Sequence, residues 1–236
     1  MTTNKVALIT GANKGLGLEV ARQLGQQGIT VVLGARDETK GQAAAAQLKA
    51  EGIDAHSVKL DVTNAEDIAA LPVHLQERFG RLDILINNAG ISLDKLGQTE
   101  PDAFRQTYET NVIAPWFIAQ ALLPLLKEAP AGRIVNHSSI LGSLTMLSTE
   151  MREVILPAYN SSKAALNMLT VQLANALRDT RIKVNAGHPG WVKTDLGGEM
   201  APMELVDGAK TAIALALLPD DGPTGGYVHL GKPLPW

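Results

Sequence analysis

The sequence predicts an α/β fold in which helices cover both faces of a single doubly wound parallel sheet of about seven strands. Short apolar runs alternate with segments of helical periodicity along the chain. Several of these runs are almost continuously apolar, as expected when both faces of a parallel sheet are covered. The 236 residues contain no internal repeat or obvious linker. We therefore expect one domain over residues 1–236.

The expected strands follow one another along the whole chain. We place them at 5–10 (KVALIT), 29–35 (ITVVLGA), 55–60 (AHSVKL), 82–87 (LDILIN), 132–137 (GRIVNH), 181–186 (RIKVNA) and 226–230 (GYVHL). Helical segments are expected between most of them, among them 18–27, the alanine-rich stretch 43–46, 102–127 and 159–178. Right-handed crossovers then bring the carboxyl ends of the strands to one edge, where open α/β sheets bind ligands.

Composition argues against several classes of function. A net charge of -3 without a strongly basic block argues against a nucleic-acid partner. The absence of cysteine removes disulfides, thiolate metal sites and cysteine nucleophiles. No apolar run approaches the roughly 18 residues of a membrane helix, and no signal-peptide pattern opens the chain, so we expect a cytoplasmic protein without membrane contact. Neither a ligand-spaced histidine pair nor a G-x-S-x-G elbow is present, so metal catalysis and hydrolysis are unsupported.

A glycine-rich turn follows the first expected strand. Residues 10–17 read TGANKGLG, in which Gly11, Gly15 and Gly17 permit close backbone approaches that a Cβ would block. The helix beyond offers free N–H groups and the positive end of its dipole, which suit a pyrophosphate. The spacing differs from the general G-x-G-x-x-G fingerprint, and a turn without a ligand is the alternative. The strand before it and the helix after it favour a Rossmann-type dinucleotide site.

Residues 159–163 read YNSSK, which places Tyr159 and Lys163 one helical turn apart on the same face. A phenol with a pKa near 10 is a poor acid or base at neutral pH. A nearby ammonium group and a bound nicotinamide cation would both favour the phenolate. The spacing alone is a weak signal, because a half-buried core tyrosine would show it too.

Six motifs, in order along most of the chain, resemble the classical short-chain dehydrogenase/reductase family. They are TGANKGLG at 10–17, NNAG at 87–90, the asparagine of TNV at 110–112, a serine in IVNHSS at 134–139, YNSSK at 159–163 and HPGWVKTD at 188–195. Finer features are similar to the carbonyl reductase branch: N-K-G in the glycine loop, ARDETKGQAA at 35–44, PGWVKTD and Trp236. The resemblance implies an NADP-dependent oxidoreductase.

The resemblance also implies a catalytic set of Asn111, Ser139, Tyr159 and Lys163. Tyr159 would give its proton to the developing alkoxide during hydride transfer, and Ser139 would hydrogen-bond the same oxygen. Lys163 would tune Tyr159 and bind the nicotinamide ribose, while Asn111 would hold a water that links Lys163 to solvent. Ser138 competes with Ser139, and the family pattern favours the second serine. Asn111 also fits a residue that kinks a helix, a role compatible with the first.

Arg36 decides which nicotinamide cofactor we expect. It stands nineteen residues after Gly17, where an NAD-binding chain would carry an acidic side chain for the ribose 2′-hydroxyl. A guanidinium cannot accept that hydrogen bond, but it clamps a 2′-phosphate well, so NADP(H) is favoured. Asp37 keeps the NAD interpretation open, although an aspartate at a helix start is more often an N-cap. Three further residues expected in this anion pocket are Asn13, Lys14 and Lys40.

The resemblance assigns the remaining cofactor contacts. Asp61 and Val62 would border the adenine, and the residues of 88–90 would line the inner face of the cofactor. Thr194 would bind the nicotinamide carboxamide beyond the turn 189–190. The full expected set is Gly11, Asn13, Lys14, Gly15, Leu16, Gly17, Arg36, Lys40, Asp61, Val62, Asn88, Ala89, Gly90, Tyr159, Lys163, Pro189, Gly190, Val192 and Thr194. His137 and His188 hold no family catalytic position, and we expect them to be packed or hydrogen-bonded residues.

The substrate pocket is expected to be apolar and adaptable. Its walls would be Ser139, Ile140, Leu144 and Met146 on one side, and Trp191, Leu196, Met200 and Met203 on the other. Paired glycines at 197–198 suggest that the second wall moves. No cluster of basic residues points to a charged substrate, so we expect a ketone, aldehyde or quinone of moderate size.

The stretch 141–154 makes the Ser139–Tyr159 separation longer than in compact family members, and it reads as a loop or a short amphipathic helix beside the site. It is much shorter than the insertion of typical carbonyl reductases. Helices 102–127 and 159–178 would then be free to pair, giving a homo-dimer or homo-tetramer, although an apolar stripe also suits intrachain packing. Two other functions stay open: an NAD-linked alcohol or steroid dehydrogenase, and a non-catalytic NADP-sensing scaffold. Intact Ser139, Tyr159 and Lys163 argue against the scaffold.

Overall fold

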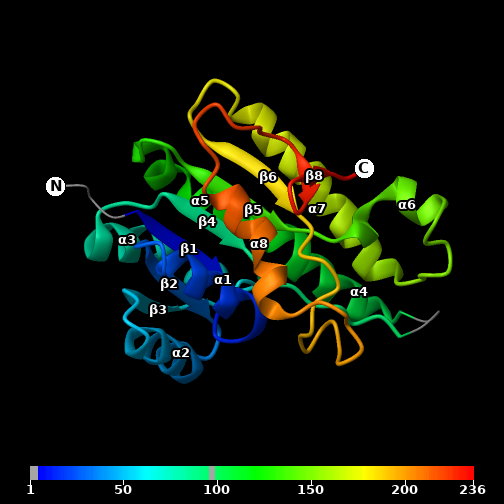
Figure 1. The fold of residues 1–236 in the computed structure, drawn as a ribbon, viewed down its shortest axis with the longest axis horizontal. Coiled ribbons are helices and arrows are strands. Elements are labelled where there is room, and N and C mark those ends of the chain that lie inside the picture. The colour runs from blue at the N-terminus through cyan, green and yellow to red at the C-terminus, as the bar shows by residue number, and fades with distance from the viewer. Residues whose placement is uncertain (1–4, 96–98) are drawn as a thin grey trace.

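The computed structural model describes residues 5–95 and 99–236, whose strands form one sheet in the order β3-β2-β1-β4-β5-β6-β7-β8. Figure 1 shows this sheet crossing the molecule, with helices in front of it and behind it. The strands are β1 (Val6–Thr10), β2 (Thr30–Ala35), β3 (Ala55–Lys59), β4 (Ile84–Asn87), β5 (Arg133–His137), β6 (Lys183–Gly187), β7 (Tyr227–His229) and β8 (Lys232–Pro233). The first seven run parallel and coincide with the predicted strands. The antiparallel β8 was not predicted.

The order of the strands reverses between β1 and β4, which makes the carboxyl ends of these two strands the topological switch point. The helical elements are α1 (Gly15–Gly25), α2 (Glu38–Ala50), α3 (Ala65–Phe79), α4 (Pro101–Tyr108), the π-helix η1 (Glu109–Ile113), α5 (Ala114–Glu128), the 3₁₀-helix η2 (Ile140–Gly142), α6 (Leu144–Ser148), α7 (Pro157–Ala176) and α8 (Leu205–Ala216). The fold predicted from the alternation of strands and helices is therefore confirmed.

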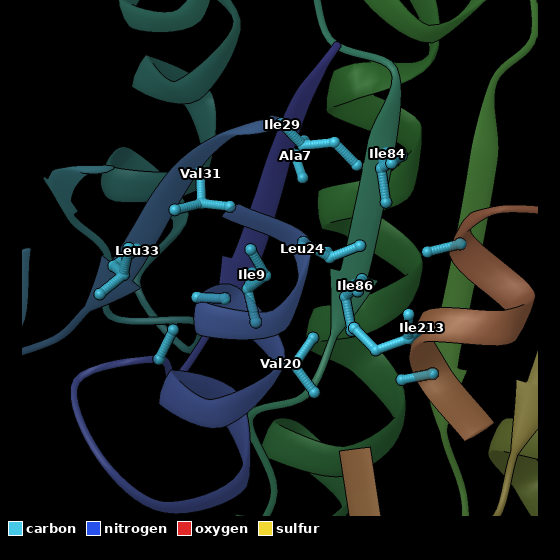
Figure 2. Packing of buried hydrophobic residues seen from close by; sticks show 14 of the residues in the cluster. Ala7, Ile9, Val20, Leu24, Ile29, Val31, Leu33, Ile84, Ile86 and Ile213 are labelled. Atoms are coloured by element: carbon cyan, nitrogen blue, oxygen red, sulfur yellow. The ribbon is translucent and has the colours of Figure 1, made fainter. Parts of the chain in front are cut away.

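Alternating strand residues supply two apolar cores, one on each face of the sheet. On one face, Ile9 and Ile86 of the strands pack against α1, α2 and α8. Figure 2 shows this packing, with Val20 and Leu24 of α1 and Ile213 of α8 lying over the strand side chains. On the other face, strand residues such as Leu8 and Leu85 meet α3, α5 and α7. Burial on both faces explains why these strands read as apolar runs.

Two helix boundaries differ from the predictions. Helix α1 begins at Gly15, not at 18, so Gly15 and Gly17 belong to its first turn. The predicted helix 102–127 is divided, because the chain changes from α4 to the π-helix η1 before it continues as α5. A single π-turn inside a helix widens it locally and is frequent at functional sites. Periodicity does not reveal such a turn.

The segment between Ser139 and Tyr159 contains η2 and α6, in line with the short helix expected there. No helix within 5–95 and 99–236 has the length and apolar character needed to cross a lipid bilayer. The same described residues hold no group of three or more His, Asp or Glu side chains arranged for a metal ion.

A buried chain of polar side chains fastens α7 to the middle of the sheet. Asn87 donates to Asn136 at 2.8 Å, and Asn136 donates to the Thr170 hydroxyl at 2.9 Å. Thr170 in turn donates to the carbonyl of Leu166 at 2.8 Å. All three polar residues are buried, so each bond replaces a contact with water that folding removes. The chain fixes α7, and therefore Tyr159 and Lys163, relative to β4 and β5.

Replacing Thr170 by valine should lower the free energy of unfolding by about 1–3 kcal/mol, because the amide of Asn136 then loses its buried acceptor. Thr170→Ser keeps the hydroxyl and should retain most of the stability. Denaturant unfolding followed by circular dichroism measures both. A larger loss in Thr170→Ser than in Thr170→Val would show that the methyl group, not the hydrogen bond, holds this site.

Candidate active site

The glycine loop between β1 and α1 approaches the loop after β4 too closely for side chains. A Cβ on Gly11 would lie 3.1 Å from the Cα of Ala89, and one on Gly17 would lie 2.4 Å from the amide nitrogen of Asn88. Gly11 and Gly15 also have left-handed φ values of 63° and 56°. No side chain caps the first turn of α1. The N–H groups at this helix start therefore have no side-chain acceptor from a cap. This backbone is suited to an anionic group at the helix start.

Asn88 ties the carboxyl ends of three strands together. Its amide nitrogen donates to the carbonyl oxygens of Thr10 at 2.8 Å and Gly11 at 3.2 Å. Its oxygen lies 2.9 Å from Nδ1 of His137 at the end of β5. The backbone N–H groups of Asn88 and Ala89 both donate to the Thr10 hydroxyl. The side chain expected to line the cofactor thus also builds the loop that would hold it.

Tyr159 and Lys163 lie on the buried face of α7, as their spacing predicts. The Lys163 ammonium is 5.6 Å from the centre of the Tyr159 ring and donates to the carbonyl of His137 at 2.8 Å. A Cβ on Gly90 would lie 3.5 Å from both Lys163 Nζ and Asn111 Oδ1. Two of the four residues expected to act together, Asn111 and Lys163, therefore meet at Gly90 after β4, and Tyr159 lies beside Lys163.

Burial dominates the protonation of this pair. It raises the pKa of Tyr159, and a hydrogen bond with Ser139 lowers that pKa only in part. Burial also lowers the pKa of Lys163 to about 8. The sequence-based expectation combined the Lys163 ammonium with a bound nicotinamide cation, and it stays a prediction for the complex with the cofactor. In the protein by itself, loss of solvation is the larger effect on Tyr159, and the Lys163 ammonium donates to the His137 carbonyl.

Ser138 and Ser139 point in different directions. The Ser138 hydroxyl donates to Oδ1 of Asn167 in α7 at 2.6 Å, so it is engaged inside the protein. The Ser139 oxygen accepts the N–H of Leu141 at 3.2 Å and also hydrogen-bonds with Tyr159. Because a backbone donor occupies one lone pair of Ser139, its proton remains available for a neighbouring oxygen. The geometry favours Ser139 over Ser138 as the serine that faces Tyr159.

Asn111 lies inside the π-helix and is fully buried. Its amide accepts from the N–H of Ile91 at 2.9 Å and donates to the carbonyl of Ile91 at 2.8 Å. A further bond runs from its amide nitrogen to the Ser162 hydroxyl at 3.0 Å. Its side chain therefore links the loop after β4 to α7. None of these three bonds goes to the backbone of its own helix.

Asp94 is a functional residue that sequence reasoning missed. Its carboxylate accepts the backbone N–H of Ala158 at 3.0 Å and of Tyr159 at 2.8 Å. It thus caps the first turn of α7, where no local side chain does so, and its charge favours the positive end of the helix dipole. The sequence around the start of α7 gives no indication of this cap, because Asp94 lies in a loop more than 60 residues earlier.

The structure separates the roles of Arg36 and Asp37. Asp37 is the N-cap of α2 and accepts the N–H of Lys40 at 3.0 Å. That hydrogen bond lowers the pKa of Asp37. Lys40 Nζ lies 3.6 Å from the same carboxylate. Arg36 follows β2 directly, is exposed, and has no hydrogen bond or ion pair with any side chain of the described ranges.

The other residues expected at the adenine end are mostly engaged in local structure. Asp61 forms a turn by accepting the N–H of Thr63 at 3.0 Å, and Val62 packs against the core beside α3. Lys14 forms an exposed ion pair with Asp195, and Asn13 is half-buried. The Lys14–Asp195 pair connects the glycine loop to the segment after β6.

The segment 188–205 folds back over the glycine loop. A Cβ on Gly15 would lie 3.9 Å from the methyl group of Thr194. Thr194 accepts the N–H of Gly197 at 3.0 Å. Gly190 has a left-handed φ of 101°, and a Cβ there would strike Met203, so both backbone and space favour glycine. Val192 is buried and forms a bridge with Met203. Leu16 packs partly buried beside the core of α1 and α8.

His137 is buried and His188 is half-buried beside the site. Burial, with smaller contributions from Lys163 and His188, lowers the pKa of His137 to about 3. Burial also lowers the pKa of His188 to about 4, with His229 contributing. The two imidazoles are therefore neutral at pH 7, and His137 serves Asn88 as a hydrogen-bond partner. This agrees with the structural role that the sequence suggested.

The expected substrate walls lie on two separate segments. Leu144 of α6 is 71% exposed and Met200 is 85% exposed, whereas Ile140 and Met146 are half-buried. Trp191 is 57% exposed and donates to the carbonyl of Gly197 at 2.7 Å. Leu196 is also exposed. These side chains are apolar and mostly exposed, and no hydrogen bond among the described residues joins the two walls.

A model of the family described as short chain dehydrogenase matches residues 5–205. The chain belongs to this family. Carbonyl reductase (NADPH) 1 of Bos taurus is 35% identical, with 100% of this chain and 99% of the relative covered. The (-)-isopiperitenone reductase of Mentha piperita is 32% identical, with 98% of each covered. The solved structure of NADPH-bound carbonyl reductase from chicken fatty liver is 30% identical, covers 99% of both chains and has a TM-score of 0.88.

Gly17→Ala should weaken NADPH binding at least about tenfold, because a Cβ there collides with Asn88 and the backbone of Gly11 and so opens the loop. Fluorescence titration with NADPH measures the change. Gly28→Ala is the control: Gly28 also has a positive φ, of 78°, but a Cβ there meets nothing within 4 Å. It should reduce stability and leave the affinity for NADPH unchanged. Equal weakening by both variants would contradict the close-approach argument.

Proposed function

We propose that this chain is an NADPH-dependent carbonyl reductase that reduces a ketone, aldehyde or quinone to the corresponding alcohol. The observation that carries the proposal is the convergence of Tyr159, Lys163 and Ser139 at the carboxyl end of β5, beside a glycine loop suited to a dinucleotide. Full-length similarity to carbonyl reductases supports an NADP-dependent oxidoreductase.

The residues present fit a nicotinamide dinucleotide. The contacts that Gly11 and Gly17 make without side chains leave a backbone cradle at an uncapped helix start, which suits a pyrophosphate. Arg36 would hold the 2′-phosphate, Thr194 the carboxamide and Lys163 the nicotinamide ribose. When bound, NADPH supplies the hydride that reduces the carbonyl carbon.

Tyr159 would act as the general acid. Because burial raises its pKa, its phenol stays protonated at neutral pH and carries the proton that a carbonyl oxygen needs as it becomes an alkoxide. Ser139 would donate a second hydrogen bond to the same oxygen and stabilise its developing charge. In the opposite direction, the oxidation of an alcohol, Tyr159 would accept the proton as a phenolate.

Lys163 would stabilise negative charge on Tyr159 once the proton has left. Its ammonium is held by the His137 carbonyl at 2.8 Å and lies close to the ring. With a pKa of about 8, the lysine is charged at pH 7 and loses its charge above pH 8. Asn111 would support this arrangement by fixing the loop at Gly90, next to the ammonium.

The selectivity for NADPH would rest on Arg36. Its guanidinium is exposed and has no partner among the described side chains, whereas Asp37 is committed to the N-cap of α2. An N-cap aspartate that accepts a backbone N–H is less able to receive a ribose hydroxyl as well. This argues against the NAD-linked alcohol or steroid dehydrogenase. The intact catalytic set argues against a non-catalytic sensor.

The substrate would be a carbonyl compound without a strong charge. The side chains of Leu144, Trp191, Leu196 and Met200 are exposed and apolar, so covering an apolar molecule would remove apolar surface from water and gain free energy. A homo-dimer or homo-tetramer stays a prediction. Phe117 of α5 and Met168 of α7 are exposed apolar side chains on the two helices expected to pair.

Tyr159→Phe should reduce kcat for carbonyl reduction by about 10²–10⁴-fold, because the only change is the loss of the acidic hydroxyl. Affinity for NADPH should stay within about twofold, since the ring and Lys163 remain. The assay follows the absorbance of NADPH with a panel of ketones, aldehydes and quinones. Tyr108→Phe, the same change in α4, should behave as wild type. Undiminished activity of Tyr159→Phe would overturn the mechanism.

Arg36→Glu should raise the dissociation constant for NADPH by roughly 10–100-fold, because a charge-assisted contact becomes a repulsion with the 2′-phosphate. Binding of NADH should improve at the same time, since a carboxylate accepts the free 2′-hydroxyl. Arg178→Glu, which makes the same charge change at the far end of α7, controls for net charge. Unchanged NADPH affinity in Arg36→Glu would count against the assignment of the cofactor.

A further inference from the structure

Tyr227 of β7 makes a buried contact with the backbone of Ser139. Its hydroxyl donates to the Ser139 carbonyl at 2.5 Å, and its side chain belongs to a residue only 2% exposed. The two residues are 88 positions apart in sequence, so the bond joins the last part of the sheet to the loop after β5. The same carbonyl accepts the N–H of Gly142 at 2.8 Å. Two donors therefore hold the peptide group between Ser139 and Ile140 in place.

Asn167 of α7 also holds the loop that contains Ser139. Asn167 accepts the Ser138 hydroxyl at 2.6 Å, donates to the Gly142 carbonyl at 3.4 Å and hydrogen-bonds with Tyr227. A Cβ on Gly142 would lie 2.7 Å from the backbone of Lys163. The 3₁₀-helix η2 thus packs directly against the turn of α7 that carries Lys163. Tyr227 contacts the same segment through the Ser139 carbonyl.

Trp236 extends this contact to the pocket wall. Its ring stacks on Tyr227 with 5.2 Å between centroids and 25° between planes. Its main-chain oxygen accepts the N–H of Thr145, near the start of α6, at 3.0 Å. Helix α6 has only five residues, and none of them is buried, so it has little apolar packing of its own. The bond to Trp236 supplies an anchor for the segment that carries Leu144 and Met146.

We propose that Tyr227 and Trp236 form a clasp that sets the position of Ser139 and of α6 for the reaction. Tyr227 is a positioning residue: it acts through the Ser139 peptide and does not itself touch the substrate. Trp236 acts on the pocket wall by keeping Tyr227 stacked and α6 in place. This inference rests on the proposed function, because it concerns the serine that assists Tyr159.

The clasp has a consequence for proton transfer. The hydrogen bond between Ser139 and Tyr159 opposes the rise that burial causes in the pKa of Tyr159. If the Ser139 loop loses its fixed position, this opposition weakens and the Tyr159 pKa rises further. The inflection of the pH–rate profile that reports Tyr159 must then move to higher pH. Burial raises the pKa of Tyr227 itself, so Tyr227 remains a neutral donor throughout this range.

Tyr227→Phe tests the first part, because it removes only the hydroxyl and keeps the ring that stacks on Trp236. We expect kcat for carbonyl reduction to fall roughly 3–10-fold, with the affinity for NADPH unchanged and the alkaline inflection displaced upward. A merely structural role would lower the melting temperature without moving that inflection. Tyr108→Phe is the matched control, since Tyr108 stacks on Phe104 at 5.2 Å in α4, outside the clasp.

Trp236→Ala and Trp236→Phe test the second part and also apply if Tyr227→Phe does not fold. The alanine variant keeps the main-chain oxygen but loses the ring that stacks on Tyr227 and holds this oxygen in place for Thr145. It should therefore raise KM for the carbonyl substrate several-fold while the affinity for NADPH stays the same. The phenylalanine variant keeps an aromatic ring against Tyr227 and should restore most of the lost KM. Equal KM values in wild type and Trp236→Ala would overturn the role of Trp236.

The Tyr159→Phe variant, assayed in parallel, separates the two proposals. An inactive Tyr159→Phe together with a Tyr227→Phe that keeps the wild-type kcat and pH profile would overturn the clasp and leave the proposed function standing. An active Tyr159→Phe would overturn the proposed function itself. An inactive Tyr159→Phe with a slowed, alkaline-displaced Tyr227→Phe supports both.

Discussion

The site depends on the close approach of two backbone segments at the switch point of the sheet. Gly11 and Gly17 lack the Cβ atoms that would keep the loop after β1 away from the loop after β4. The Asn88 side chain joins the two loops by hydrogen bonds. The same side chain engages His137, so the end of β5 is drawn into the arrangement. Because β5 carries the carbonyl that holds Lys163, one amide group connects the binding half of the site to the reacting half.

Helix α7 brings its reactive face into position through contacts at three levels. Asp94 fixes its first turn, the Lys163 ammonium reaches the end of β5, and Thr170 is bonded to the centre of the sheet. The contacts of Lys163 and Thr170 are buried, and that of Asp94 is partly buried. Burial also controls the acidity of the groups, since it opposes charge on both Tyr159 and Lys163. A neutral phenol beside an ammonium group with a lowered pKa is suited to proton donation. The contacts of α7 fix the position of this donor.

The fold was predictable because both faces of its parallel sheet are covered, so each strand is an apolar run that sequence alone reveals. The glycine loop and the Tyr159–Lys163 pair could be recognised because their chemistry lies in short local motifs. What sequence could not supply was non-local: the cap from Asp94, the π-turn around Asn111 and the contact between Tyr227 and Ser139. The effect of burial on the pKa of Tyr159 was equally out of reach, since burial is a property of the whole fold.

The short strand β8 has a bearing on how the molecule meets its neighbours. It pairs antiparallel with β7 and contains Pro233, which has no N–H to offer to a further strand. This side of the sheet is therefore a poor template for lateral growth. At the opposite side, β3 pairs only with β2 among the described strands. Any edge-to-edge polymerisation of this protein would accordingly have to start from β3, which makes that strand the natural place to introduce a charge or a proline in a variant meant for high concentration.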